Sequence, residues 1–169
     1  GQYLHLMQNQ AAKNGLRLMF KDFKKMIAVS SAVIFFIALD RFLKVFALSD
    51  PGSARNLLGD FLRFNFKANY YIAFSLPLAG QWLNIVICLI ILSLIFYLAR
   101  AWRSGKQEIA VCLFITVVGA ASNLYDRLKY GFVIDYLDLK YFTVLNLADV
   151  MIVAGVFLLL VILNKKEAA

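Results

Sequence analysis

The sequence predicts an all-α membrane protein of four transmembrane helices, with a small extracytoplasmic β-sheet between the first and second helices. Of its 169 residues, 62% are hydrophobic and only 17% are charged, whereas soluble domains carry about a quarter charged residues. The apolar residues gather in four blocks, at 26–48, 82–98, 109–124 and 145–163. Each block is about as long as the stretch of roughly 17–25 residues that crosses a hydrocarbon core.

An interfacial segment is expected before the first span. Residues 1–25 are polar and basic, and four of their apolar side chains recur at helical spacing, namely Leu16, Met19, Phe20 and Phe23. This pattern favours an amphipathic helix on the membrane surface, with a partly ordered tail as the alternative. Residues 26–164 then form the membrane domain, with extracytoplasmic loops at 49–81 and 125–144, and residues 165–169 form a cytoplasmic tail.

Basic residues predict the orientation of the spans. They cluster at 13–25 before the first span, at 100–106 between the second and third, and at 165–166 after the fourth. An even number of spans places all three clusters on one side, which the positive-inside rule makes cytoplasmic. We therefore expect both termini in the cytoplasm and the two longer loops outside it.

Two local patterns add detail to this topology. Apolar and polar residues alternate from Leu62 to Asn69, which is the period of a half-buried strand and predicts the small sheet at the interface. In the third span, the run of small residues from Gly119 to Ser122 predicts close packing against another helix.

Composition excludes several kinds of site. His5 is the only histidine, which argues against histidine triads and multi-histidine metal centres. Cys88 and Cys112 each lie within an apolar run, so neither a disulfide framework nor a metal-ligand spacing follows from them. The net charge of +8 comes from Lys and Arg beside apolar blocks, which favours anionic headgroups over nucleic acid as the partner. We expect no metal and no cofactor.

Four aspartates lie near the ends of predicted spans, where ionisable groups are costly and usually functional. Asp40 ends the first span with Lys44 one helical turn later, and Asp126 follows the third span. Asp135 lies in the second loop, and Asp149 lies at the start of the fourth span. The predicted topology puts all four aspartates toward the extracytoplasmic side, so we expect them to converge.

Converging carboxylates have a specific chemistry. Two carboxylates in contact cannot both ionise cheaply, so they share a proton. The ionised one takes a proton from water while the protonated one polarises a carbonyl, which is peptide hydrolysis without serine, cysteine or metal. The structural alternative pairs each aspartate with a nearby base, as for Asp40 with Lys44 and Asp126 with Arg127. For the other two aspartates, no basic residue lies within four positions.

Five short motifs follow one another along the chain, at 40–44, 69–74, 118–127, 133–136 and 145–149. They read Asp-Arg-Phe-Leu-Lys, Asn-Tyr-Tyr-Ile-Ala-Phe, Val-Gly-Ala-Ala-Ser-Asn-Leu-Tyr-Asp-Arg, Val-Ile-Asp-Tyr and Leu-Asn-Leu-Ala-Asp. In their order and residues they resemble the motifs Asp-Gln-x-x-Lys, Asn-x-Gly-Ala-Ala-Phe, Gly-Gly-Ala-x-Gly-Asn-x-x-Asp-Arg, Val-Val-Asp-Phe and Phe-Asn-x-Ala-Asp. Those are the motifs of the lipoprotein signal peptidase (signal peptidase II) family.

This resemblance implies an intramembrane aspartyl endopeptidase that removes prolipoprotein signal peptides by cutting before the diacylglyceryl-modified cysteine. It implies a bacterial cytoplasmic (inner) membrane, an extracytoplasmic β-cradle, and lipidated precursors and membrane lipids as partners; we expect a monomer. The catalytic pair would be Asp135 and Asp149. The substrate backbone or the aspartates would be oriented by four polar residues, namely Asn69, Asn123, Arg127 and Asn146. The site would be braced by Asp40, Lys44 and Asp126.

The chain departs from the family motifs at several positions. Tyr71 and Ile72 stand where the family has Gly and Ala, Ser122 replaces a Gly, and Arg41 replaces a Gln. Bulk at the first two positions predicts a narrower groove or a shifted backbone. Two alternatives therefore stay open: a catalytically weakened relative that binds lipidated peptides, and a small transporter or proton-relay subunit that uses the intramembrane aspartates.

Overall fold

The structure, a computed structural model, describes residues 2–70 and 80–167. Tyr71 and Ile72 lie outside the described residues. The chain divides into two units, Gly1–Phe35 and Phe36–Ala169, and every site residue proposed from the sequence falls in the second unit.

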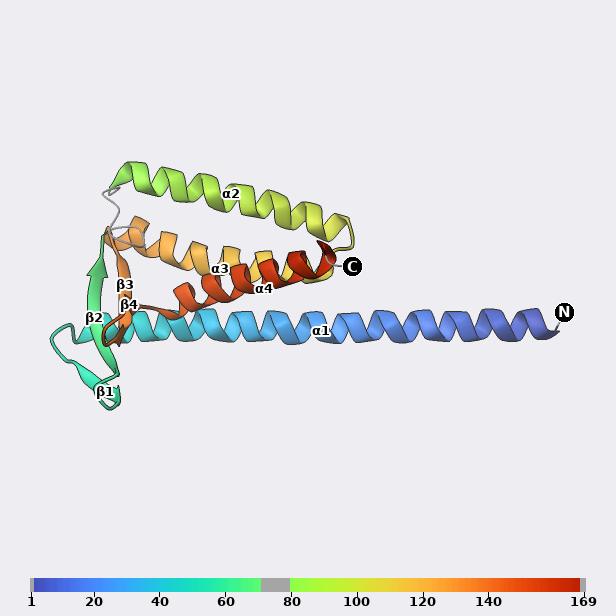
Figure 1. Ribbon diagram of the computed structural model, residues 1–169, viewed down its shortest axis with the longest axis horizontal. Coiled ribbons are helices and arrows are strands. Elements are labelled where there is room, and N and C mark those ends of the chain that lie inside the picture. The colour runs from blue at the N-terminus through green and yellow to red at the C-terminus, as the bar shows by residue number, and fades with distance from the viewer. Residues whose placement is uncertain (1, 71–79, 168–169) are drawn as a thin grey trace. The chain divides into compact units, whose positions relative to one another are not determined.

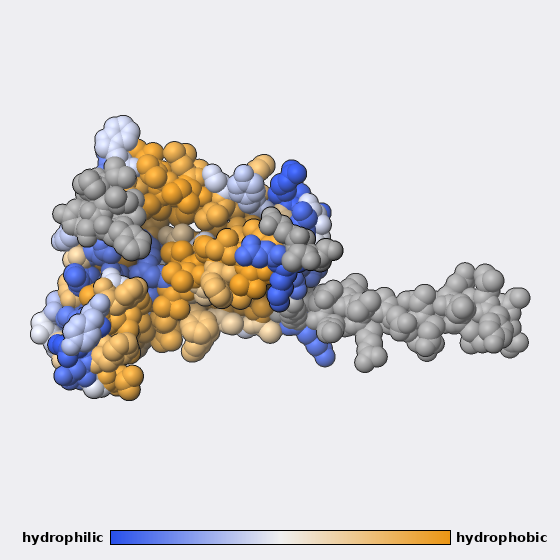
Figure 2. All heavy atoms as spheres, viewed as in Figure 1, coloured by the Kyte–Doolittle hydropathy of each residue, from blue (hydrophilic) through white to orange (hydrophobic). Residues whose placement is uncertain are grey.

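The described residues contain four long helices: α1 (Gln2–Ser49), α2 (Gln81–Arg103), α3 (Gln107–Tyr130) and α4 (Leu147–Glu167). Each includes a stretch long and apolar enough to cross a membrane, at Met26–Ser49, Gln81–Arg103, Gln107–Tyr130 and Leu147–Lys165. The predicted multi-pass architecture is confirmed. In Figure 2, hydrophobic residues cover much of the visible surface of α2 and α4, as a surface in contact with lipid requires.

The third helix is longer than its apolar block predicts. It continues past residue 124 to Tyr130 and ends where Gly131 adopts a left-handed conformation, with φ 83°. The Gly131 N–H donates to the carbonyl of Arg127, which satisfies one of the open carbonyls at the helix end. Asp126 and Arg127 therefore lie on α3 itself, and the loop predicted at 125–144 begins later.

A four-stranded antiparallel sheet has the order β1-β2-β3-β4. Its strands are β1 (Arg55–Leu58), β2 (Leu62–Asn69), β3 (Val133–Leu139) and β4 (Val144–Leu145). The predicted strand at 62–69 is confirmed as β2. The sheet is not built only from the connection between the first and second helices, because β3 and β4 come from the second long connection. Residues 133–136 of β3 are all buried, so β3 lacks the alternation that identified β2.

The sheet lies at one end of α2, α3 and α4, away from the short link between α2 and α3 (Figure 1). It packs on the last turns of α1 through a cluster that includes Ala47, Phe64, Ile134 and Tyr136. The Phe64 ring lies 5.5 Å from the rings of both Phe46 and Tyr136. This packing brings β3 beside the C-terminal end of α1.

Two glycines allow α3 and α4 to approach closely. A Cβ atom built on Gly119 would lie 2.7 Å from the carbonyl oxygen of Ala148, and one built on Gly155 would lie 2.8 Å from that of Cys112. Neither position has room for a larger residue without a shift. The predicted close packing at Gly119 is thus present, and it brings the start of α4 against α3.

Candidate active site

Asn146 links the two aspartates that the sequence singles out. It is the residue before α4, and its side-chain oxygen accepts from the backbone N–H of Asp149 at 2.9 Å. In return, Asp149 Oδ2 accepts from the backbone N–H of Asn146 at 3.2 Å, which is the reciprocal pattern of a capping box. The amide nitrogen of Asn146 is left to donate to Asp135 Oδ1 at 2.7 Å. One asparagine side chain therefore contacts both residues.

Asp135 lies on β3 and is 1% exposed. Besides Asn146, its carboxylate accepts a hydrogen bond from Asn69 Nδ2 at 2.9 Å, and Asn69 is the last residue of the neighbouring strand β2. Burial raises the pKa of Asp135 from 3.8 to about 7, and the negative charge of Asp149 adds to this effect. The two amide donors oppose the shift, because they stabilise the ionised carboxylate. Asp135 can therefore hold a proton near neutral pH.

Asp149 lies in the first turn of α4. Its Oδ1 accepts a hydrogen bond from Asn123 Nδ2 of α3 at 2.7 Å. The positive end of the α4 dipole favours a negative charge at this position. Unlike Asp135, which is buried, Asp149 is half-buried.

A group of four charges, of which all but the half-buried Arg41 are fully buried, lies beside Asp135 and Asp149. Lys44, which is 1% exposed, lies 3.1 Å from Asp40 on its own helix and 2.8 Å from Asp126 on α3. Arg41 lies 2.7 Å from Asp126 and 3.3 Å from Asp40. The group contains two positive and two negative charges, so it is neutral as a whole. Without that balance, burying these ions would cost several kcal/mol for each one.

This charged group is connected to the aspartate pair by hydrogen bonds. Lys44 donates to Asn123 Oδ1 at 2.9 Å, and the other end of that amide donates to Asp149. On the opposite side, Tyr136 donates to Asp40 Oδ1 at 3.1 Å and accepts from the backbone N–H of Leu147 at 3.1 Å. The group thus holds both the start of α4 and the strand that carries Asp135.

Arg127 completes the predicted set. Its guanidinium donates to the backbone carbonyl of Asn69 at 3.5 Å and interacts electrostatically with Asp135 and Asp149. The sequence suggested that Asp126 could pair with Arg127, its neighbour in the chain. The structure instead gives Asp126 ion pairs with Lys44 and Arg41 of α1.

Three residues of the site were not assigned a role from the sequence. Arg41 makes the ion pairs described above, the Ser122 hydroxyl donates to Asp40 at 2.8 Å, and Tyr136 is fully buried. The role of Arg41 could have been predicted from the sequence, because a third charge beside Asp40 and Lys44 near the end of an apolar span needs a partner. Nothing in the local sequence marks the hydroxyl of Ser122 or Tyr136, because their partner is distant along the chain.

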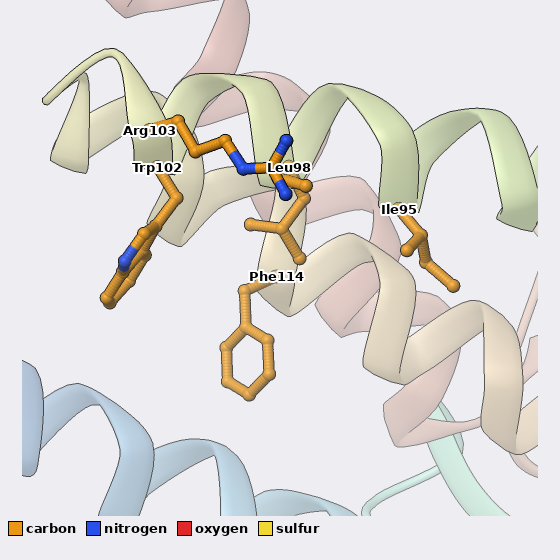
Figure 3. Close-up of a pocket in the computed structure, with 6 residues that line it drawn as sticks. Ile95, Leu98, Trp102, Arg103 and Phe114 are labelled. Carbon is orange, nitrogen blue, oxygen red and sulfur yellow. The ribbon is translucent and has the colours of Figure 1, made fainter.

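A hollow of about 370 Å³ lies between α2 and α3 toward their short link and is shown in Figure 3. Its lining residues are Ile95, Leu98, Ala99, Trp102, Arg103 and Phe114. The lining contains one cation and no acid or nucleophile. Phe114 is twelve residues before Asp126 on α3, a rise of about 18 Å. This hollow is therefore separate from the aspartate site.

Comparisons with known proteins agree with the motif pattern. The family model described as Signal peptidase (SPase) II matches residues 32–165. A lipoprotein signal peptidase of Syntrophomonas wolfei subsp. wolfei is 37% identical over 75% of this chain and 85% of its own length. One from Halothermothrix orenii is 31% identical over 80% and 94%. A solved bacterial membrane enzyme shares the fold, with a TM-score of 0.72 at 21% identity over 83% of this chain and 89% of that one.

Proposed function

The chain belongs to the signal peptidase II family, a family of peptidases, and we propose that it removes signal peptides from prolipoproteins with Asp135 and Asp149 as an aspartyl pair. The proposal includes cleavage before the diacylglyceryl-modified cysteine. The observation that carries it is the double contact of Asn146, whose amide nitrogen donates to Asp135 while its amide oxygen accepts from the backbone of Asp149.

The two carboxyls have different environments, and this difference supports different roles. Asp135 is buried on a strand, and its pKa of about 7 lets it carry the shared proton. Asp149 is half-buried at the start of a helix, and hydrogen bonds from Asn123 and the Asn146 backbone hold its carboxylate in place. We therefore assign Asp149 as the base and Asp135 as the acid.

Hydrolysis then proceeds in two steps. In the first, Asp149 takes a proton from a water molecule whose oxygen bonds to the scissile carbonyl carbon, while Asp135 gives its proton to the carbonyl oxygen. In the second, the carbon–nitrogen bond breaks as the nitrogen receives the proton held by Asp149. The proton on the former carbonyl oxygen returns to Asp135 when the carbonyl group reforms, so the pair is restored.

The remaining polar residues have supporting roles in this proposal. Asn69 and Asn146 hold the carboxylate of Asp135, and Asn123 holds that of Asp149. Arg127, bonded to the carbonyl of Asn69, lies where it stabilises negative charge near the pair. The site is braced by the ion pairs of Lys44 with Asp40 and Asp126. Fixing reacting groups in this way lowers the barrier by removing reorganisation during the reaction.

The proposal also places the reaction at the outer surface of the bacterial inner membrane. The basic clusters of the sequence put the short link between α2 and α3 in the cytoplasm, and the sheet lies at the other end of these helices (Figure 1). A site at that depth suits a substrate that is itself a membrane helix with a lipid attached near the cut. We propose further that the protein acts as a monomer.

The direct test mixes the purified chain with a lipid-modified prolipoprotein and follows release of a fragment of signal-peptide size. The same precursor without its lipid should be cut far less, and mass spectrometry of the product should place the new amino terminus at the lipidated cysteine. Binding of the precursor without cleavage would instead favour the weakened relative. A native chain that neither binds nor cuts the lipidated precursor would contradict the proposal.

A further inference from the structure

The hollow between α2 and α3 places one cation beside an apolar wall. Its wall is apolar except for Arg103, which lies at the end of α2. Figure 3 shows the Arg103 side chain running back along the helix toward Leu98. This direction follows from helix geometry, because side chains tilt toward the helix N-terminus. The guanidinium is thereby directed toward the hydrophobic part of the span.

Arg103 has no acidic partner among the residues that the structure describes. The ion pairs found in those residues involve Arg41, Lys44, Arg55 and Lys140. Arg100 and Lys106 add two further positive charges within one turn of Arg103 along the chain, and the nearest acid in sequence is the exposed Glu108. A guanidinium near hydrocarbon is costly unless an anion compensates it.

We infer that this hollow is a binding site for an anionic phospholipid. One acyl chain would lie against Ile95, Leu98 and Phe114, and the phosphate would accept hydrogen bonds from the Arg103 guanidinium. The volume of about 370 Å³ suits part of an acyl chain, and basic residues beside grooves between membrane helices are typical of anionic lipid sites. This inference does not rest on the proposed peptidase activity.

The chain provides its own optical probe for this site. It has two tryptophans, Trp82 and Trp102, and only Trp102 lines the hollow. They are twenty positions apart on α2, so about 30 Å separates them along the helix axis. The variant Trp82→Phe leaves Trp102 as the reporter, and Trp102→Phe leaves Trp82 as a matched reporter at the other end of the same helix.

The experiment uses the full-length Trp82→Phe chain in nanodiscs of phosphatidylcholine and phosphatidylglycerol. Bromine atoms, which quench tryptophan on near contact, are placed on the acyl chains of one lipid at a time at equal mole fraction. We expect brominated phosphatidylglycerol to be enriched about fivefold at Trp102, the factor that corresponds to about 1 kcal/mol for one basic residue. Trp82 should show no such preference.

Two variants test the role of the cation. Arg103→Gln should reduce the preference to equal quenching, with quenching by phosphatidylcholine retained as proof that the hollow still forms. Arg55→Gln removes one charge from β1 and should leave the preference unchanged. Equal quenching by both lipids in the chain that retains Arg103, a preference that survives Arg103→Gln, or no quenching of Trp102 by either lipid would each overturn the inference.

Discussion

The ammonium group of Lys44 lies 2.9 Å from the side-chain oxygen of Asn123. The same amide donates from its nitrogen to Asp149 at 2.7 Å, so the position of one carboxylate depends on a cation on another helix. Lys44 also forms ion pairs with Asp40 and Asp126, which are both fully buried. A single lysine therefore contributes to the stability of the bundle and to the geometry of the site.

Replacing Lys44 by Met should destabilise the protein by about 3–5 kcal/mol, because two buried carboxylates are then left with Arg41 as their remaining partner and one negative charge is uncompensated. Thermal unfolding in detergent at pH 7 would measure the loss. Lys67→Met removes a lysine that is exposed on β2 and should have little effect. Adding Asp126→Asn to Lys44→Met should recover part of the stability, since one uncompensated charge is removed. Unchanged stability of Lys44→Met would contradict the buried ion pairs.

The changes Asp135→Asn and Asp149→Asn should each abolish cleavage of the lipidated precursor, while the double change costs little more. Groups that act as one unit show this non-additivity, because either loss removes the shared proton chemistry. The control is Asp138→Asn, three positions along β3 and hydrogen-bonded to Asn65, which should retain turnover. Normal rates in either single variant would rule out the aspartyl pair.

Cleavage should decline as the pH rises through about 7. The pKa of Asp135 is raised to about 7, so the proton that this residue must donate is lost above that pH. Asn69→Ala removes a hydrogen bond that stabilises the ionised carboxylate. The pKa of Asp135 then rises further, and the alkaline limb should move up by roughly one pH unit. Rates measured from pH 5 to 10 would detect this, with Asn65→Ala as the matched variant; a downward shift would reverse the assignment.

Gly155→Ala should destabilise the protein by about 1–3 kcal/mol, the range for overpacking a tight contact. The added methyl group would meet the hydroxyl of Thr116 and lie 2.8 Å from the carbonyl oxygen of Cys112. Gly52→Ala is the control, because a Cβ at Gly52 has no atom within 4 Å. Melting temperatures of the two variants measured side by side would test whether α3 and α4 are in such close contact.

The proposed orientation can be tested by cysteine labelling in intact cells. In a chain carrying Cys88→Ser and Cys112→Ala, a membrane-impermeant maleimide should label Ser53→Cys, between α1 and β1. It should not label Ser104→Cys in the link between α2 and α3 until the membrane is permeabilised. The opposite pattern would invert the topology and move the aspartate site to the cytoplasmic side.

The sequence alone determined the four spans, the strand at 62–69 and the approach of Gly119 to a neighbouring helix. These follow from length, hydropathy, alternation and residue size, which are properties of contiguous residues. The sequence also pointed to Asp135 and Asp149, because carboxylates near the ends of spans need an explanation.

Tertiary structure decided how these residues are held. Lys44 pairs with Asp126 across two helices, Ser122 donates to Asp40 over a separation of 82 positions, and Tyr136 ties Asp40 to the start of α4. The central strand β3 lacks alternation because its first four residues are all buried, so only its pairing with β2 and β4 identifies it. Such contacts form between elements that are far apart along the chain. They are stabilised because charges and hydroxyls are buried together, and a local sequence pattern cannot predict which of these groups meet.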